Sequence, residues 1–124
     1  MSYLYIILGA VIGAPLRYLV GSQFKPGPWG NFPLGTFVVN VTGCFIIGLL
    51  LEFFAERGSL SREARLFLVT GFLGSYTTFS AFGWETYDLV KVSEPLTAAA
   101  YAGLSLGVGI LAVWAGAAVA RAIS

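Results

Sequence analysis

The sequence predicts an all-α membrane protein with four transmembrane helices in a single domain. Of its 124 residues, 57% are hydrophobic and only 10% are charged, whereas soluble domains carry about 25% charged residues. The charges also leave three long gaps, over residues 26–51, 66–84 and 95–120. Each gap is long enough to cross the ~30 Å hydrocarbon core of a lipid bilayer as a helix. A fourth apolar stretch, residues 3–16, precedes the first charged residue.

Inside a bilayer every backbone N–H and C=O group needs a partner within the protein, so each apolar stretch is expected to be helical. No basic residue precedes Arg17, which argues against a cleaved signal peptide. Pro33 is expected at the first position of the second helix, and Ser61 is expected to cap the third. Trp29 is expected at the membrane interface. The expected helices, which leave no residues for a soluble domain, cover residues 3–21, 33–56, 62–90 and 95–121.

The basic residues near the helix ends barely choose an orientation in the membrane. Four spans put both termini and the second loop on one side of the bilayer. That side then holds four arginines against three basic residues on the other, too small a bias for the positive-inside rule to decide. Either copies insert both ways up and pair antiparallel, or partner subunits and early helices override a weak signal. The two sets are Arg57, Arg62, Arg65 and Arg121 against Arg17, Lys25 and Lys91.

Several function classes find no support in the composition. A formal net charge of +1 offers no basic stripe for nucleic acid. The single cysteine, Cys44, lies inside a span and cannot form an intrachain disulfide. The chain has no histidine and no recognisable catalytic motif, so an enzyme is not expected. Proton-coupled carriers usually need a titratable group inside the membrane, yet no Asp or Glu lies deep inside an expected span. Glu52, Glu56, Glu85 and Asp88 all lie toward helix ends.

Asn40 is the most polar residue in the middle of the second helix. Thr36 and Gly43 lie on the same helix face, one turn away on either side. An amide in this position either bonds to a neighbouring helix or faces a water-filled path through the membrane.

The third helix is expected to be broken near its middle. Gly71 and Gly74 weaken the helix, and the hydroxyl residues that follow offer the backbone alternative hydrogen bonds. The carbonyl oxygens freed at such a break are hard ligands that suit an alkali cation. The alternative is an unbroken, pliable helix. After the break, Phe79 and Phe82 share one face. They serve either ordinary packing against lipid or the core, or, with the positive edges of their rings turned toward a narrow path, the binding of an anion.

Small and hydroxyl residues also pattern the fourth helix. Tyr101, Ser105 and Gly109 form one stripe, which serves either interhelical hydrogen bonding or the lining of a pore. Pairs of glycines one turn apart are expected to allow close helix contact; they are Gly9 with Gly13 and Gly103 with Gly107.

Four motifs resemble the CrcB/Fluc family of fluoride channels, and together they span nearly the whole chain. They are residues 9–18, residues 35–43, residues 71–82 and the Tyr101/Ser105 stripe. The third motif is the most specific. The resemblance implies an antiparallel, dual-topology homodimer in a prokaryotic inner membrane, with two pores that export fluoride passively and lower its cytoplasmic level.

The resemblance also implies a role for individual residues. The fluoride path would include Asn40, Phe79, Phe82, Tyr101 and Ser105, with Ser80 and Thr36 also counted on it. Arg17 would lie by the aqueous vestibule. The backbone carbonyls of Gly74 and Thr77, from both copies, would hold one central structural Na⁺ ion.

Three positions depart from the usual family pattern. Ala81 stands where threonine is common, and Ser75-Tyr76 replaces a more typical Gly-Leu pair. Gly109 replaces a hydroxyl residue and leaves the length of the hydroxyl track open. The main alternative function is a small dual-topology multidrug or metabolite exporter, which would need a membrane carboxylate that the first helix lacks. A non-conducting assembly subunit would explain the glycines but not Asn40.

Overall fold

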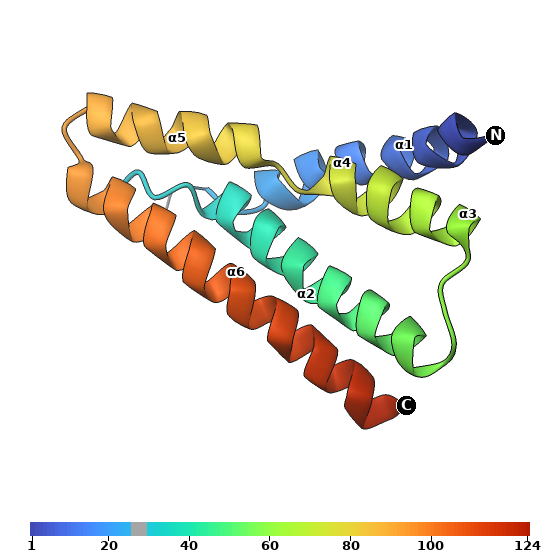
Figure 1. Cartoon of the computed structure of the whole chain (residues 1–124). Coiled ribbons are helices and arrows are strands. Elements are labelled where there is room, and N and C mark those ends of the chain that lie inside the picture. The colour runs from blue at the N-terminus through green and yellow to red at the C-terminus, as the bar shows by residue number, and fades with distance from the viewer. Residues whose placement is uncertain (26–29) are drawn as a thin grey trace.

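The computed structural model describes residues 1–25 and 30–124, so the predicted position of Trp29 lies outside the described residues. Within them, four helical stretches are long and apolar enough to cross a membrane, which confirms the four-helix prediction (Figure 1). Their ends differ from the predicted ones by at most two residues. The elements are α1 (Ser2–Ser22), α2 (Leu34–Glu56), a third stretch made of α3 (Arg62–Arg65), η1 (Leu66–Leu73), α4 (Gly74–Tyr76) and α5 (Phe79–Lys91), and finally α6 (Pro95–Ile123).

The helices are arranged as two pairs that diverge toward one end of the molecule (Figure 1). One pair is α1 against η1 and α4, and the other is α2 against α6. Beyond α4, helix α5 crosses to the start of α6 and packs against it. Both termini and α3 lie at the open end of the divergence (Figure 1).

Glycines bring the helices of each pair into backbone contact. A Cβ atom on Gly9 would collide with the backbone of Phe67 in η1, and one on Gly13 with that of Phe72. The predicted role of these two glycines in close packing is therefore confirmed. In the other pair, a Cβ on Gly48 would collide with the backbone of Val113 in α6.

The same prediction is wrong for the second glycine pair within one chain. No described atom lies within 4 Å of a Cβ built on Gly103 or Gly107. These glycines lie on the outer face of α6, because its inner face toward α2 carries Gly109 and Gly116 instead.

Of the two residues predicted to begin helices, Ser61 has its predicted role and Pro33 does not. Ser61 caps α3 as predicted, since its Oγ accepts a hydrogen bond of 3.1 Å from the Ala64 amide. Pro33 is not the first helical residue. Its ψ of 74° lies outside the helical region, and α2 begins one residue later, at Leu34.

The third stretch changes its backbone geometry twice. Residues of η1 form a π-helix, which is wider than an α-helix. Between α4 and α5, Thr77 and Thr78 adopt extended conformations with ψ of 161° and 116°. The Thr78 hydroxyl then caps α5 by accepting a 3.1 Å hydrogen bond from the Ala81 amide.

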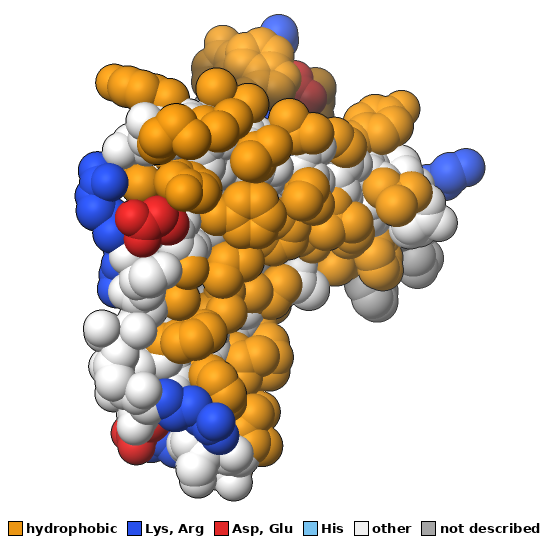
Figure 2. Space-filling view, turned by 90° about the vertical axis from the view of Figure 1, so that its right-hand side faces the viewer, with side chains coloured by type: hydrophobic (Ala, Val, Ile, Leu, Met, Phe, Trp, Pro, Cys, Tyr) orange, Lys and Arg blue, Asp and Glu red, His pale blue; other side chains and the backbone are white. Residues whose placement is uncertain are grey.

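Most of the large hydrophobic side chains lie on the surface of the chain, and few are gathered in a central core. In Figure 2 they form a continuous apolar face, with charged side chains at its margins. Among the described residues, the buried side chains include two small clusters, around Val39 and around Tyr101. Such a surface is stable in lipid and not in water. The chain is a multi-pass membrane protein.

Candidate functional site

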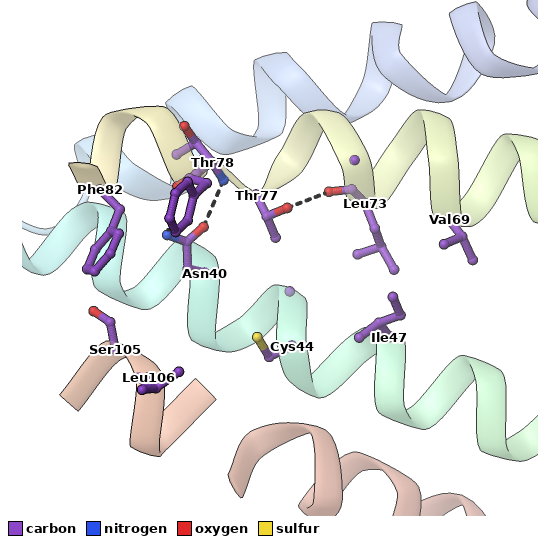
Figure 3. Close-up of a pocket in the computed structure, with 13 residues that line it drawn as sticks. Asn40, Cys44, Ile47, Val69, Leu73, Thr77, Thr78, Phe82, Ser105 and Leu106 are labelled. Atoms are coloured by element: carbon purple, nitrogen blue, oxygen red, sulfur yellow. Dashed lines mark hydrogen bonds between the residues drawn. The ribbon is translucent and has the colours of Figure 1, made fainter. Parts of the chain in front are cut away.

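A groove of about 440 Å³ runs between the two helix pairs (Figure 3). We call it the central groove. Most of its wall is apolar, with a few polar groups near the Thr77–Thr78 segment. Its lining residues come from α2, from the third stretch and from α6: Asn40, Gly43, Cys44, Ile47, Val69, Leu73, Gly74, Thr77, Thr78, Phe79, Phe82, Ser105 and Leu106.

Asn40 holds the extended segment through two hydrogen bonds. The Thr78 amide donates to Asn40 Oδ1 at 2.8 Å, and Asn40 Nδ2 donates to the Thr78 carbonyl oxygen at 3.1 Å. The first bond fixes which end of the side-chain amide carries the nitrogen. Since Nδ2 has two hydrogens, one N–H remains without a partner among the described residues, at the wall of the central groove.

Ser105 supplies a second donor to this groove. Its Oγ atom is buried and has no hydrogen-bond partner within the described part of the chain. Buried hydroxyls without a partner are rare, because desolvating one costs about 1–3 kcal/mol. Ser105 therefore marks a position where a ligand or a water molecule completes the structure.

Phe79 and Phe82 lie on the same side of the central groove as the extended segment. Their ring centroids are 5.7 Å apart, with the planes inclined by 45°. Phe82 also packs against the buried ring of Tyr101, 5.1 Å away. Phe79 is 83% exposed, so a single chain leaves one wall of the site open.

Two backbone carbonyls near the extended segment lack their helical donors. The Thr78 amide, which would bond to the Gly74 oxygen in a continuous helix, bonds to Asn40 instead. The Ala81 amide, which would bond to the Thr77 oxygen, bonds to the Thr78 hydroxyl. In the described part of the chain neither carbonyl accepts any hydrogen bond.

Glu85 connects two of the predicted hydroxyl residues. Thr36 Oγ1 donates to one oxygen of its carboxylate at 2.8 Å, and the Tyr101 hydroxyl donates to the other at 2.9 Å. Both hydroxyl hydrogens are therefore directed at a carboxylate rather than at the central groove. Tyr101 is fully buried, so its partner is fixed by the packing around it.

A second cavity of about 670 Å³, which we call the vestibule cavity, is more polar than the central groove and includes Glu85 in its wall. It is lined by Arg17, Glu85 and Asp88, among others. Arg17 also lines a smaller cavity of about 280 Å³ together with Thr36 and Thr78. Thr78 belongs to the central groove as well. Arg17 and Thr36 thus line both of these cavities, and Thr78 lines both the smaller cavity and the central groove.

The structure places most of the predicted site residues on these three cavities and leaves two aside. Tyr101 is fully buried and lines none of the three cavities. Ser80 is exposed and lines none of the three cavities, and its hydroxyl lies 3.4 Å from that of Thr78. Sequence reasoning did not include Glu85, which it assigned to a helix end. The available signal was its spacing, because Thr78, Phe82 and Glu85 fall on one helix face at i, i+4 and i+7.

Comparison with known proteins identifies the family. Residues 4–117 match the family model described as CrcB-like protein, Camphor Resistance (CrcB). This chain belongs to the CrcB family.

Several curated members of the CrcB family match over nearly their full length. The chain is 47% identical to a protein of Acidobacterium capsulatum over 94% of this chain and 93% of the relative. It is 46% identical to one of Solibacter usitatus, over 98% and 99% respectively. It is 47% identical to one of a Roseiflexus species, over 99% of each. All three relatives carry the name fluoride-specific ion channel FluC.

Proposed function

We propose that the chain is a subunit of a fluoride-selective channel that lets fluoride leave the cytoplasm passively. The observation that carries this proposal is the unpartnered Ser105 hydroxyl in the central groove. Together with the second N–H of Asn40, it offers hydrogen-bond donors that have no partner among the described residues. The names of the relatives, which are those of an ion channel, support the same function.

Fluoride is small and strongly hydrated, so a selective path must replace its water with closely spaced donors. The proposed donors are the Asn40 amide and the Ser105 hydroxyl, and the ring edges of Phe79 and Phe82 add weak positive charge. A narrow, mostly apolar groove excludes bulk water and strengthens these interactions. Chloride, which is larger and less strongly hydrated, would be rejected by the width and donor density of the path.

Arg17 would raise the local concentration of anions at the vestibule cavity. Its guanidinium makes no ion pair with any described residue. From there the proposed path passes Thr36 and Thr78 and reaches the groove. Because Glu85 occupies the hydroxyls of Thr36 and Tyr101, fluoride must either displace its carboxylate or pass beside it.

The functional unit is proposed to be an antiparallel homodimer with two pores. The exposed ring of Phe79 and the open side of the central groove support a second copy as the missing wall. The even distribution of basic residues supports insertion of the two copies in opposite directions. The relatives are bacterial, which supports the inner membrane of a prokaryote as the location.

The carbonyls of Gly74 and Thr77 fit a structural Na⁺ ion. Both are hard oxygen donors left without a hydrogen bond in the described part of the chain, and alkali cations bind such oxygens at helix breaks. The same two carbonyls from each copy would form the proposed site. A bound cation would offset negative charge near the path and hold the two copies together.

The exporter alternative is less well supported. A drug or metabolite carrier in this size class needs a membrane carboxylate that can release its protons to a substrate. In α1 no acidic residue exists, and the Glu85 carboxylate is occupied by two hydroxyl donors.

Efflux from liposomes tests the proposal. The purified protein, reconstituted at low density in liposomes loaded with both potassium fluoride and potassium chloride, should release fluoride within seconds of adding a potassium ionophore. Chloride should remain inside, as it should in liposomes without protein. A preparation that elutes as a folded dimer and releases no fluoride would overturn the proposed function.

Labelling tests the proposed dual topology. A Ser22→Cys substitution in a Cys44→Ala background places one thiol at the end of α1. In intact cells, a membrane-impermeant maleimide should label about half of the molecules, because copies insert both ways. Complete labelling or complete protection would contradict dual topology.

A further inference from the structure

A second side-chain hydrogen bond ties α2 to the third stretch, beside the Asn40–Thr78 pair. The Tyr76 hydroxyl lies 2.8 Å from Thr42 Oγ1. The Thr42 hydroxyl itself donates to the backbone carbonyls of Val38 and Val39, at 2.8 and 3.0 Å. Either oxygen could donate in the bond between the two side chains. Because threonine has a single hydroxyl hydrogen, Tyr76 is the donor when Thr42 donates to these carbonyls.

Burial and stacking hold the Tyr76 side chain in one place. The residue is only 4% exposed. Its ring stacks on that of Phe72, with centroids 6.0 Å apart and planes inclined by 10°. A tyrosine ring fixed in this way can point its hydroxyl at one partner only, so the bond to Thr42 has a defined direction.

The two cross-helix bonds lie on either side of Thr77. Tyr76 is the last residue of α4, directly before the extended segment, and Thr78 ends that segment. Between them, α2 approaches so closely that a Cβ on Gly43 would collide with the Thr77 side chain. The segment also bonds to its own stretch, through the carbonyl of Leu73 and the amide of Ala81. The two cross-helix bonds add a tie to α2 at each of its ends.

We propose that Tyr76 and Thr42 are positioning residues whose hydrogen bond holds the Thr77–Thr78 segment in register with α2. The bond thereby keeps Asn40 in the orientation that leaves its second N–H facing the central groove. The link to fluoride movement rests on the proposed function, whereas the register of the segment can be measured independently of it.

Amide hydrogen exchange tests the register directly. The variants are Tyr76→Phe and Thr42→Val, each of which removes one hydroxyl, and the double variant. Thr42→Ser, which keeps the hydroxyl, is the matched control at the same position. Tyr87→Phe controls for loss of a tyrosine hydroxyl, because Tyr87 is 58% exposed and its hydroxyl bonds to no described residue. Mass spectrometry of peptides over residues 73–82 reports the exchange of the Thr78 amide.

Each single variant should exchange about threefold to tenfold faster in these peptides than the wild type, since one net hydrogen bond is lost. The double variant should be no faster than either single one, because both remove the same bond. Fluoride efflux should fall in the same three variants and stay near wild type in both controls.

Unchanged exchange in Tyr76→Phe and Thr42→Val would overturn the proposal, and so would additive effects in the double variant. A fall in fluoride efflux without faster exchange would also contradict it, since positioning would then not be the cause. If the wild type conducts no fluoride, the proposed function fails, but the exchange measurement still decides the role of the pair. Should Tyr76→Phe fail to fold, Thr42→Val removes the same bond from the other helix.

Discussion

Asn40 bonds to both the amide and the carbonyl group of Thr78, at 2.8 and 3.1 Å, across 38 residues of sequence. The side-chain amide thus takes the place of a helical partner at the point where α4 gives way to α5. An extended segment inside a membrane needs such a partner, because lipid offers none. One side chain therefore stabilises the segment and presents a donor to the central groove.

Asn40→Asp should separate these two contributions. Aspartate keeps the size of the side chain and can still accept from the Thr78 amide, but it loses both N–H donors and adds negative charge. We expect fluoride efflux to fall about 100-fold, the scale on which removal of a single donor to an anion acts. Gln23→Glu, the same chemical change at an exposed position, should leave efflux unchanged. An Asn40→Asp protein that conducts normally would count against Asn40 as part of the path.

Ser105→Ala should affect transport and stability in opposite ways. A buried hydroxyl without a partner destabilises the fold, so its removal should leave the melting temperature of the protein unchanged or raise it. Fluoride efflux should nevertheless fall, because the path loses a donor. If Ser105 were a structural residue, the variant would lose stability and activity together, and thermal unfolding measured beside efflux distinguishes the two results.

Glu85→Gln should lower stability through its two hydroxyl partners. The amide oxygen can accept a hydrogen bond, but its nitrogen cannot, so one of Thr36 and Tyr101 is left without an acceptor. Loss of a hydrogen bond to a charged group costs about 1.5–3 kcal/mol. The check is a double-mutant cycle with Tyr101→Phe, in which the combined loss should be smaller than the sum of the single losses. Additive losses would mean that the bond between Tyr101 and Glu85 contributes little.

Gly48→Ala should separate α2 from α6. The added Cβ would collide with the backbone of Val113, and such overpacking costs about 1–3 kcal/mol. Gly107→Ala is the matched control on the same helix pair, since its Cβ meets open space within the chain. We expect a lower unfolding temperature for the first variant only. Equal losses would instead indicate that the outer face of α6 is packed against another copy.

The sequence was sufficient to predict where the four helices lie along the chain, but not which of their residues come into contact. Hydropathy and the gaps between charges located all four spans, because lipid permits few other structures for such runs. The π-helical geometry of η1 could not be predicted, since a run of eight residues that is apolar except for Thr70 carries no clear periodicity. The outward position of Gly103 and Gly107 was equally hidden, because two glycine steps share α6 and only packing decides which one faces α2.

The candidate site could likewise be predicted only in part. Asn40, Phe82 and Ser105 could be selected as candidates because polar and aromatic residues at fixed helical spacing are informative in a span. The hydrogen-bond partners of the site residues could not be predicted, because the bonds from Asn40 to Thr78 and from Thr36 to Glu85 join residues far apart in the sequence. Glu85 was assigned to a helix end by distance along the chain, whereas α5 begins anew at Phe79 and places it beside the buried Tyr101.

The most direct test of the central claim compares fluoride and chloride efflux in the wild type and in Phe79→Ile. Phe79 lines the central groove but is 83% exposed in a single chain, so its substitution changes little packing within that chain beyond its contact with the ring of Phe82. We expect rapid fluoride release from wild-type liposomes, its loss in the folded Phe79→Ile protein, and retention of chloride in both. Equal fluoride release from the two proteins, or chloride release as fast as that of fluoride, would contradict it.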